Sequence, residues 1–345
     1  LNCLQVLMRR VPGGLALSVT IMGTILAATT GIIGASVIMM SLLALPIMVE
    51  RKYSHELATG TIAASGTLGI LIPPSIMLVI MADLLSRSVG NLFVAAVFPG
   101  LILATLYMAY IVIRCTFNPS LAPPITEKLG PQTRGGVALM ILRSFIPPVI
   151  LIGLVLGSIL GGVATPTEAA GVGALGAIVL GFFNLVILPS MGVRAFTLEV
   201  TNSATKTAGH SSAGPSKKFS QFSQTLSAVL DSTAQTNAMI FGLFVGATFF
   251  SYIFRALGGD DLVISTVEAM GLGPWGLLFL LLGLVFILGF FFDWIEITLI
   301  VLPVFAPIIA QLDFGDHVAR IDVVYWFAVL IAINLQTSFL TPPFG

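Results

Sequence analysis

The sequence predicts an all-α polytopic membrane protein made of two inverted repeats, each with a re-entrant helical hairpin and a proline-broken helix. Three observations lead to this fold class. Hydrophobic residues fill 57% of the 345 positions and charged residues only 9%, whereas soluble domains carry about 25% charged residues. Long apolar stretches recur along the chain, and a pair of adjacent prolines interrupts two of them. Such a chain cannot cover itself with a polar surface, so we expect a lipid bilayer to surround it.

Two of the apolar stretches predict hairpins that enter the membrane halfway and return on the same side. A crossing helix needs about 20 apolar residues, and these two stretches are too long for one crossing and too interrupted for two. Their centres are the segments 29–36 and 289–294. A pair of tight crossing helices is the alternative interpretation of each. The apolar stretches cover residues 13–49, 57–82, 91–117, 136–163, 167–189, 232–257, 272–310 and 321–341.

The distribution of charge predicts which face each loop occupies. If both hairpins return to their own side, twelve of the 15 Lys and Arg residues fall on one face, in segments 1–12, 49–56, 114–143 and 190–231. The positive-inside rule assigns that face to the cytoplasm. The first hairpin then enters from the cytoplasm and the second from outside, which is typical of an inverted-repeat transporter. The outer face carries Arg87, Arg255 and Arg320 beside Asp260, Asp261, Glu268, Asp313, Asp316 and Asp322.

These assignments divide the chain into five parts. The first and last are the two repeats of a transport domain, with scaffold-type helices between them. In the polar part before the sixth stretch we expect a flexible cytoplasmic loop, followed by either an interfacial helix or more loop. Leu1 and Gly345 are interpreted as the cut ends of a longer chain. The parts are residues 1–90 (hairpin 13–49, broken helix 57–82), 91–189, 190–231, 232–271 and 272–345 (hairpin 272–310, broken helix 321–345).

The two double-proline motifs predict breaks in the helices that follow the hairpins. A proline has no N–H to donate and clashes with the carbonyl four residues earlier. Pro73-Pro74 would free the carbonyls of Gly69 and Ile70, and Pro342-Pro343 those of Ser338 and Phe339. An unsatisfied backbone group in hydrocarbon costs several kcal/mol, so protein, water or an ion must fill the gap. Bare carbonyl and hydroxyl oxygens suit sodium or hydronium, while a plain proline kink is the alternative.

Acidic residues in apolar surroundings mark further candidates. Asp293 and Glu296 lie in the second hairpin, where an acidic residue usually marks an ion or proton path. Asp293 is interpreted as a cation ligand or as a brace for the tip. Glu296 would lie on the same helix face as Asp293 if this segment is helical, and a structural hydrogen-bond partner is the alternative interpretation of Glu296. Thr165-Pro166-Thr167-Glu168 predicts a capped helix start instead of a substrate contact.

Several function classes are excluded by what the sequence lacks. The net charge of zero gives no support to a nucleic-acid partner. His55, His210 and His317 share no metal-ligand spacing, so no transition metal is expected. The sequence has no P-loop, zinc-protease motif or nucleophile elbow. We therefore predict a carrier and no enzyme, with no cofactor beyond a coupling ion.

Four segments in order along the chain resemble one known family. They are Arg10–Ala16, Gly66–Ile76, Thr165–Ala170 and Leu340–Gly345. Gly66-Thr67-Leu68-Gly69-Ile70-Leu71-Ile72-Pro73-Pro74-Ser75-Ile76 closely resembles the signature of the large membrane subunit of tripartite ATP-independent periplasmic (TRAP) transporters, the DctM family. The tip Thr30-Gly31-Ile32-Ile33-Gly34-Ala35-Ser36 resembles the subgroup labelled mannitol/chloroaromatic-compound type.

The resemblance implies the residues that bind ions and substrate. Sodium is expected at the hairpin tips and helix breaks, and the carboxylate of an organic acid between the tips. Ile32 and Ile33 replace two hydroxyl residues of the family, so backbone carbonyls would serve the first sodium site. The expected ligands are Thr30, Gly31, Ile33, Gly34, Thr67 and Gly69 for one sodium site, Gly289, Asp293, Ser338 and Thr341 for the other, and Ser36, Pro73, Pro74, Ser75, Pro342 and Pro343 for substrate.

The resemblance also implies the mechanism and the partners. The transport domain is expected to slide against a scaffold as an elevator in the bacterial inner membrane. A small DctQ-type membrane subunit and a periplasmic DctP-type binding protein are the expected partners. A divalent-anion/sodium symporter-like carrier, which shares the hairpins and needs no binding protein, is the alternative.

Overall fold

The computed structural model describes residues 2–8, 11–30, 33–123, 134–187 and 215–340. Within these ranges the chain forms helices and no strand. The all-α prediction is therefore confirmed for this part of the chain. The elements are α1 (Asn2–Met8), α2 (Gly14–Thr30), α3 (Ile33–Glu50), α4 (His55–Thr67), η1 (Leu68–Ile70), α5 (Ile76–Leu84), α6 (Val89–Phe117), η2 (Pro119–Leu121), α7 (Arg134–Leu160), α8 (Pro166–Phe182), η3 (Phe183–Ile187), α11 (Pro215–Ala256), α12 (Gly259–Ala269), α13 (Pro274–Leu288), α14 (Trp294–Ile309), η4 (Gly315–His317), α15 (Val323–Asn334) and η5 (Leu335–Phe339).

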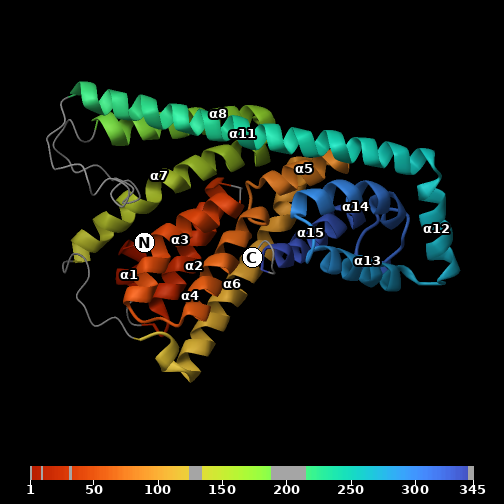
Figure 1. The fold of residues 1–345 in the computed structure, drawn as a ribbon, viewed down its shortest axis with the longest axis horizontal. Coiled ribbons are helices and arrows are strands. Elements are labelled where there is room, and N and C mark those ends of the chain that lie inside the picture. The colour runs from red at the N-terminus through yellow and green to blue at the C-terminus, as the bar shows by residue number, and fades with distance from the viewer. Residues whose placement is uncertain (1, 9–10, 31–32, 124–133, 188–214, 341–345) are drawn as a thin grey trace.

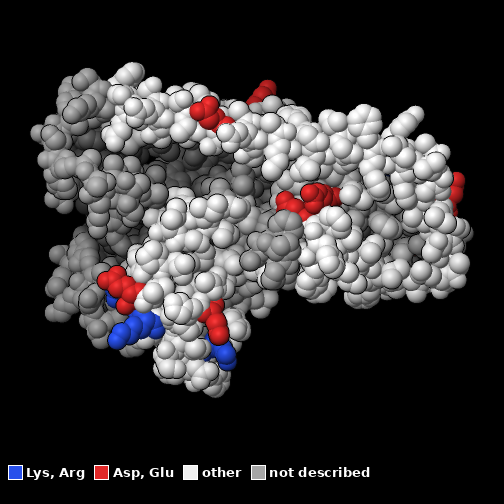
Figure 2. Space-filling view, in the orientation of Figure 1, with Lys and Arg blue, Asp and Glu red and all other residues white. Residues whose placement is uncertain are grey.

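Three described helices are long and apolar enough to cross a membrane by length and composition: Val89–Phe117, Pro166–Ile187 and Phe219–Ala256. Large apolar side chains on them are exposed, such as Phe98, Phe241 and Tyr252. In Figure 2 most of the visible surface is uncharged. The visible Lys and Arg side chains gather at the lower end of the group formed by α1–α4 and α6. A surface of this kind fits a bilayer as the solvent.

The helices form two groups with a layer of long helices over them. In Figure 1, α1–α4 and α6 lie on one side, α13–α15 on the other, and α7, α8 and α11 run across the top. The helix α5 lies with the second group, where it packs against α14 and α15. The 3-10 helix η5, which follows α15 of the second group, contacts α4 of the first group. Each broken helix therefore contacts the other group of helices.

In the described part of the chain, some segments that the charge count assigned to the same face are in contact. On the basic side, the Ser54 N–H donates to the carbonyl of Leu121 at 3.0 Å, which joins the loops after α3 and α6. On the opposite side, the Ser88 N–H donates to the Tyr325 hydroxyl at 3.3 Å. The Trp275 ring packs edge-on against His317 on that side, with ring centroids 5.4 Å apart.

One segment differs from its expected form. The boundary expected at residue 231 lies inside α11, which runs without interruption over 42 residues from Pro215 to Ala256. At 1.5 Å per residue such a helix is about 63 Å long. Pro215 suits the first turn of a helix, and no proline or glycine follows until Gly242. The polar and apolar halves therefore form one helix, and neither an isolated interfacial helix nor a plain loop occupies 215–231.

The helix start at Thr165 has the predicted capping geometry. The Thr165 hydroxyl oxygen accepts from the Glu168 N–H at 3.3 Å, and the Thr165 N–H donates to Glu168 Oε2 at 2.8 Å. Pro166 occupies the first helical position. This reciprocal pair satisfies two backbone donors of α8, which confirms the structural interpretation of the motif.

Candidate functional site

The first double proline interrupts its helix as predicted. The helix α4 ends at Thr67, a 3-10 turn follows over Leu68–Ile70, and α5 begins only at Ile76. The N–H groups of Leu71 and Ile72 both donate to the Leu68 carbonyl, at 3.1 and 2.9 Å. A proline pair cannot continue the helical ladder, so the chain turns here and restarts.

The oxygens of this first break are partly engaged. Ser75 Oγ donates to the Ile70 carbonyl at 2.6 Å, so at this carbonyl a protein side chain fills the gap left by the missing helical donor. Thr67 Oγ1 donates to the Ala64 carbonyl at 2.9 Å and also contacts the Tyr107 hydroxyl. The side chains of Thr67 and Ser75 are buried. The protein itself therefore satisfies much of the polar surface of this break.

The second break begins at Asn334. There α15 ends and the 3-10 helix η5 covers Leu335–Phe339. Thr337 Oγ1 donates to the Asn334 carbonyl at 2.8 Å, and Ser338 Oγ donates to the Leu335 carbonyl at 2.7 Å. Pro342 and Pro343 lie outside the described residues, as does Thr341.

Gln336 is a residue that sequence reasoning missed. Its side chain is 3% exposed, and neither Nε2 nor Oε1 has a hydrogen-bond partner. A buried amide without partners costs roughly 1–3 kcal/mol or more, and such a group in a native fold needs an explanation. The motif Gln336-Thr337-Ser338 was visible in the sequence, but composition alone does not tell which of these side chains is buried.

The second hairpin approaches this break at its tip. A Cβ added at Gly289, the first residue of the tip segment 289–294, would lie 3.3 Å from Thr337 Oγ1. The Asn334 side-chain amide donates to the Leu282 carbonyl of α13 at 2.6 Å. The arm α13 and the break are therefore held together by a polar contact and by a close backbone approach at a glycine.

Asp293 and Glu296 form a capping box at the start of α14. Asp293 Oδ1 accepts from the Trp294 N–H at 2.7 Å, and Glu296 Oε2 accepts from the Asp293 N–H at 3.2 Å. Of the two interpretations of Asp293, the structure shows the brace for the tip, and Glu296 is its structural partner. An ionised carboxylate has about four lone-pair sites, so capping leaves room for a further ligand.

The first hairpin packs against the first broken helix. A Cβ added at Gly23 of α2 would lie 2.6 Å from Ser65 Oγ of α4, and one added at Gly66 would collide with Val37 of α3. Ser36, at the tip side of α3, is fully buried, and Gly34 has open space beside it. The side chain of Thr30 and all of Gly31 lie outside the described residues.

All four elements meet in one hydrophobic core. This cluster contains Ile33 from the first hairpin, Ile70 and Leu71 from the first break, and Leu335 from the second break. It also contains Val285 and Trp294, which flank the tip of the second hairpin. The helix α4, which leads into the first break, also contacts η5 of the second break. The first break packs against both arms of the first hairpin, α2 and α3, and the second break packs against α13 of the second hairpin.

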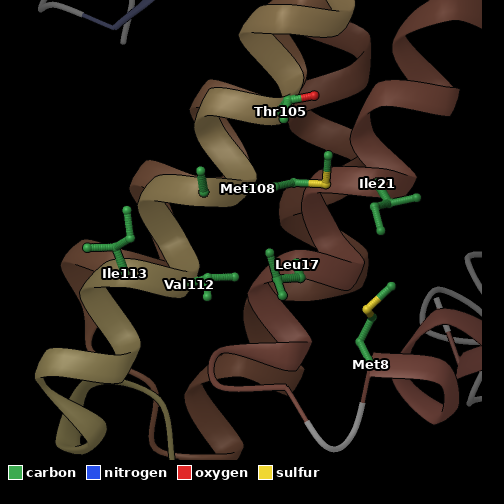
Figure 3. A pocket seen from close by; sticks show the side chains of 8 residues that line it. Met8, Leu17, Ile21, Thr105, Met108, Val112 and Ile113 are labelled. Carbon is green, nitrogen blue, oxygen red and sulfur yellow. The ribbon is translucent and has the colours of Figure 1, made fainter.

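A second hollow in the structure is apolar and, in the part of its wall that is described, lacks the polar groups that a binding site for ions or carboxylates needs. Figure 3 shows a hollow of about 430 Å³ between α6 and the helices α1 and α2. Its wall consists of aliphatic and methionine side chains, and its hydroxyl group, Thr105 Oγ1, donates to the Leu101 carbonyl at 2.7 Å. A groove without available polar groups can accept a lipid chain but gives no ligand to a carboxylate or a cation.

An all-helical fold with exposed apolar surfaces and interrupted helices is typical of a membrane permease. The family model "Tripartite ATP-independent periplasmic transporter, DctM component" matches residues 1–345. The chain therefore belongs to the DctM family of TRAP transporters, which work with a small membrane subunit and a periplasmic binding protein.

Curated relatives agree with this family and differ in cargo. The chain is 28% identical over 335 residues to the C4-dicarboxylate TRAP transporter large permease protein DctM of Pseudomonas aeruginosa, covering 96% of this chain and 67% of the relative. It is 26% identical over 345 residues to the ectoine TRAP transporter large permease protein TeaC of Halomonas elongata, covering 100% and 70%. It is 26% identical over 352 residues to the isethionate TRAP transporter permease protein DctMQ of Oleidesulfovibrio alaskensis, covering 100% and 47%.

Proposed function

We propose that this chain is the large membrane subunit of a sodium-coupled importer of small organic acids in the bacterial inner membrane. A periplasmic binding protein delivers the acid, and a transport domain carries it across by an elevator movement. The observation that carries this proposal is the meeting of two hairpins and two broken helices in one core. Broken helices near the centre of a bilayer are where carriers bind ions and substrate.

The lengths of the hairpin arms support re-entrant hairpins. The arms α2 and α3 have 17 and 18 residues, and α13 and α14 have 15 and 16. At 1.5 Å per residue they measure about 22–27 Å, less than the hydrocarbon core of about 30 Å. Because the arms are this short, re-entrant hairpins that turn inside the membrane are favoured, and two pairs of helices that cross it fully are disfavoured.

The proposed sodium ligands are oxygens around these tips and breaks. The first site uses Thr67 and Gly69 with the tip residues Thr30, Gly31, Ile33 and Gly34. The second uses Gly289, Asp293, Ser338 and Thr341, and we add Gln336 because its unpartnered amide oxygen is buried in the same turn. The substrate carboxylate lies between the tips, beside Ser36, Pro73, Pro74, Ser75, Pro342 and Pro343. The partly positive N-terminus of α14 favours an anion there.

Sodium is a sufficient energy source for such a carrier. Each positive charge that moves inward gains about 2.3 kcal/mol per 100 mV of membrane potential, in addition to its concentration gradient. Two sodium ions that accompany a divalent acid would carry no net charge, and the concentration gradient alone would then drive uptake. With a monovalent acid the potential contributes as well. The charge of the cargo therefore decides whether uptake responds to voltage.

The test is uptake into proteoliposomes that contain the full-length transporter and its small subunit. Radiolabelled succinate is a suitable first cargo, because C4-dicarboxylate is the cargo in the names of several relatives. Uptake that requires both the cognate binding protein and an inward sodium gradient is expected. Uptake without the binding protein would favour the symporter-like alternative, and uptake indifferent to sodium would contradict the coupling.

A further inference from the structure

A small pocket outside the central site is lined by two arginines. It has a volume of about 220 Å³ and lies where the loop after α5, the last turn of α11 and the second half of α14 come together. Arg87 and Arg255 line it, and Leu302, Pro303 and Ala306 form an apolar wall. No acidic side chain lines it among the described residues. Since pockets for drug-sized ligands measure about 300–1,000 Å³, this one suits a smaller molecule.

Arg255 is positioned by a defect in α14. Pro307 has no N–H, so the carbonyl of Pro303, four residues earlier, has no helical donor. Arg255 Nη2 donates to that carbonyl at 3.1 Å, which joins α11 to the second hairpin. This bond fixes the guanidinium group of Arg255 beside the pocket.

Arg87 is positioned from the other side. The Ser88 N–H donates to the Tyr325 hydroxyl at 3.3 Å, and the Arg87 N–H donates to the Ala82 carbonyl at 2.8 Å. The Arg87 guanidinium carbon lies 5.9 Å from the centre of the Tyr325 ring. These contacts hold the loop against α15 without using the N–H donors of the Arg87 side chain.

The charge around the pocket makes the pair unusual. Of the 15 Lys and Arg residues, three lie in the segments that the sequence assigns to the outer face, and two of these three line this pocket. The remaining one is Arg320. The same segments carry several Asp and Glu residues, including Asp313, Asp316 and Asp322. An anion that approaches this acidic face is repelled elsewhere and attracted here.

We propose that this pocket is an anion-binding site on the outer face, which takes the carboxylate of a small organic acid before it reaches the helix breaks. The inference rests on the proposed function for the identity of the anion. Guanidinium groups match the geometry of a carboxylate and form charge-assisted hydrogen bonds with it. The apolar wall accommodates the short carbon chain. Because α11 and α14 both border the pocket, an occupant would also bridge the two helices.

The test is binding of succinate to the purified full-length transporter without binding protein, in buffer where choline replaces sodium. These conditions separate the pocket from the proposed sodium-dependent site. Saturation-transfer NMR should detect succinate and should not detect succinamide, its uncharged analogue. Arg87→Gln and Arg255→Gln should each weaken binding about tenfold or more, since each removes a charged donor. Arg320→Gln, the matched control on the same face, should bind as the unaltered protein does.

Two results would overturn the proposal. One is the absence of succinate binding without sodium, and the other is unchanged binding in Arg87→Gln. Arg87→Gln decides the matter even if Arg255→Gln fails to fold through loss of the bond to Pro303, because the Arg87 side chain makes no hydrogen bond to the described residues. Succinate binding that follows these variants while uptake ignores sodium would support the pocket and contradict the proposed coupling.

Discussion

The two helix breaks are built on the same plan but differ in how their polar groups are satisfied. In the first break, Thr67 and Ser75 donate to carbonyls of their own turn, and Thr67 also contacts Tyr107. In the second, Thr337 and Ser338 are satisfied in the same way, but Gln336 is buried and both atoms of its amide are unpartnered. The first break is largely complete by itself, and the second retains unused hydrogen-bonding capacity.

This difference indicates where a ligand matters most. A buried group without a partner destabilises the fold until something binds it. The second break also lies close to Gly289, at the tip of the hairpin that carries Asp293. We therefore expect changes in the second repeat to affect transport more than changes in the first, and changes in the first to act mainly on stability.

The largest effect is expected at Asp293. Asp293→Ala should abolish sodium-stimulated uptake, because it removes the charge proposed to bind the cation. It should also lower the free energy of unfolding by about 0.5–2 kcal/mol, the usual value of a lost helix cap. Asp293→Asn is the matched control, since Asn caps as well as Asp but carries no charge. If Asp293→Asn transports normally in proteoliposomes, the residue is a cap and nothing more.

A substitution at Gln336 is expected to raise the stability of the protein and to lower its transport activity. Gln336→Leu removes the unpartnered amide, so the ligand-free protein should gain about 1–3 kcal/mol in the free energy of unfolding. The stabilisation by sodium and succinate, read as the shift in Tm, should shrink, and uptake should fall about tenfold or more. Thr298→Val is the control, because Thr298 Oγ1 is also buried without a partner but lies in the arm α14. Equal behaviour of the two variants would remove Gln336 from the site.

The prolines of the first break should have an intermediate effect. Replacing Pro73 and Pro74 by Ala restores two backbone donors and lets α4 extend towards α5, which should withdraw carbonyl oxygens from the proposed first sodium site. We expect the sodium concentration for half-maximal uptake to rise several-fold. An unchanged sodium dependence would mean that this break holds no cation.

The smallest effect is expected at Ser75. Ser75→Ala leaves the Ile70 carbonyl without its side-chain donor and should cost about 1 kcal/mol of stability. Thermal unfolding without sodium or succinate measures this directly. A constant Tm in Ser75→Ala would mean that the bond to Ile70 adds nothing to stability, and the contrast between the two breaks would then be weaker than described.

Much of the fold could be predicted from apolar lengths and local chemistry. The hairpin arms end close to the expected centres, at Thr30 and Ile33 in one and at Leu288 and Trp294 in the other. Proline chemistry alone predicted the interruption after Thr67. The Thr165 capping box followed from residue types at fixed spacing. These features depend on a few neighbouring residues, so the sequence carries them directly.

Features that depend on burial or on distant contacts could not be predicted in this way. The continuous α11 was missed because its polar first half was interpreted as either a separate interfacial helix or a loop, although Pro215 marks a helix start. The spacing of Asp293 and Glu296 is that of a capping box, but the apolar surroundings favoured an ion site. The isolation of the Gln336 amide and the pairing of Arg87 with Arg255 in one pocket appear only when separate helices are packed together.

The most direct test of the central claim is ligand protection of a thiol at the second break. Thr337→Cys, in a full-length protein whose native Cys3 and Cys115 are replaced by Ala, should react with a small methanethiosulfonate reagent when no ligand is present. Sodium and succinate together should slow that reaction at least about tenfold if they occupy the site. Thr105→Cys in the apolar groove of Figure 3 should react at the same rate with and without them. Equal rates at position 337 with and without ligands would contradict a transport site at the meeting point of the hairpins and the broken helices.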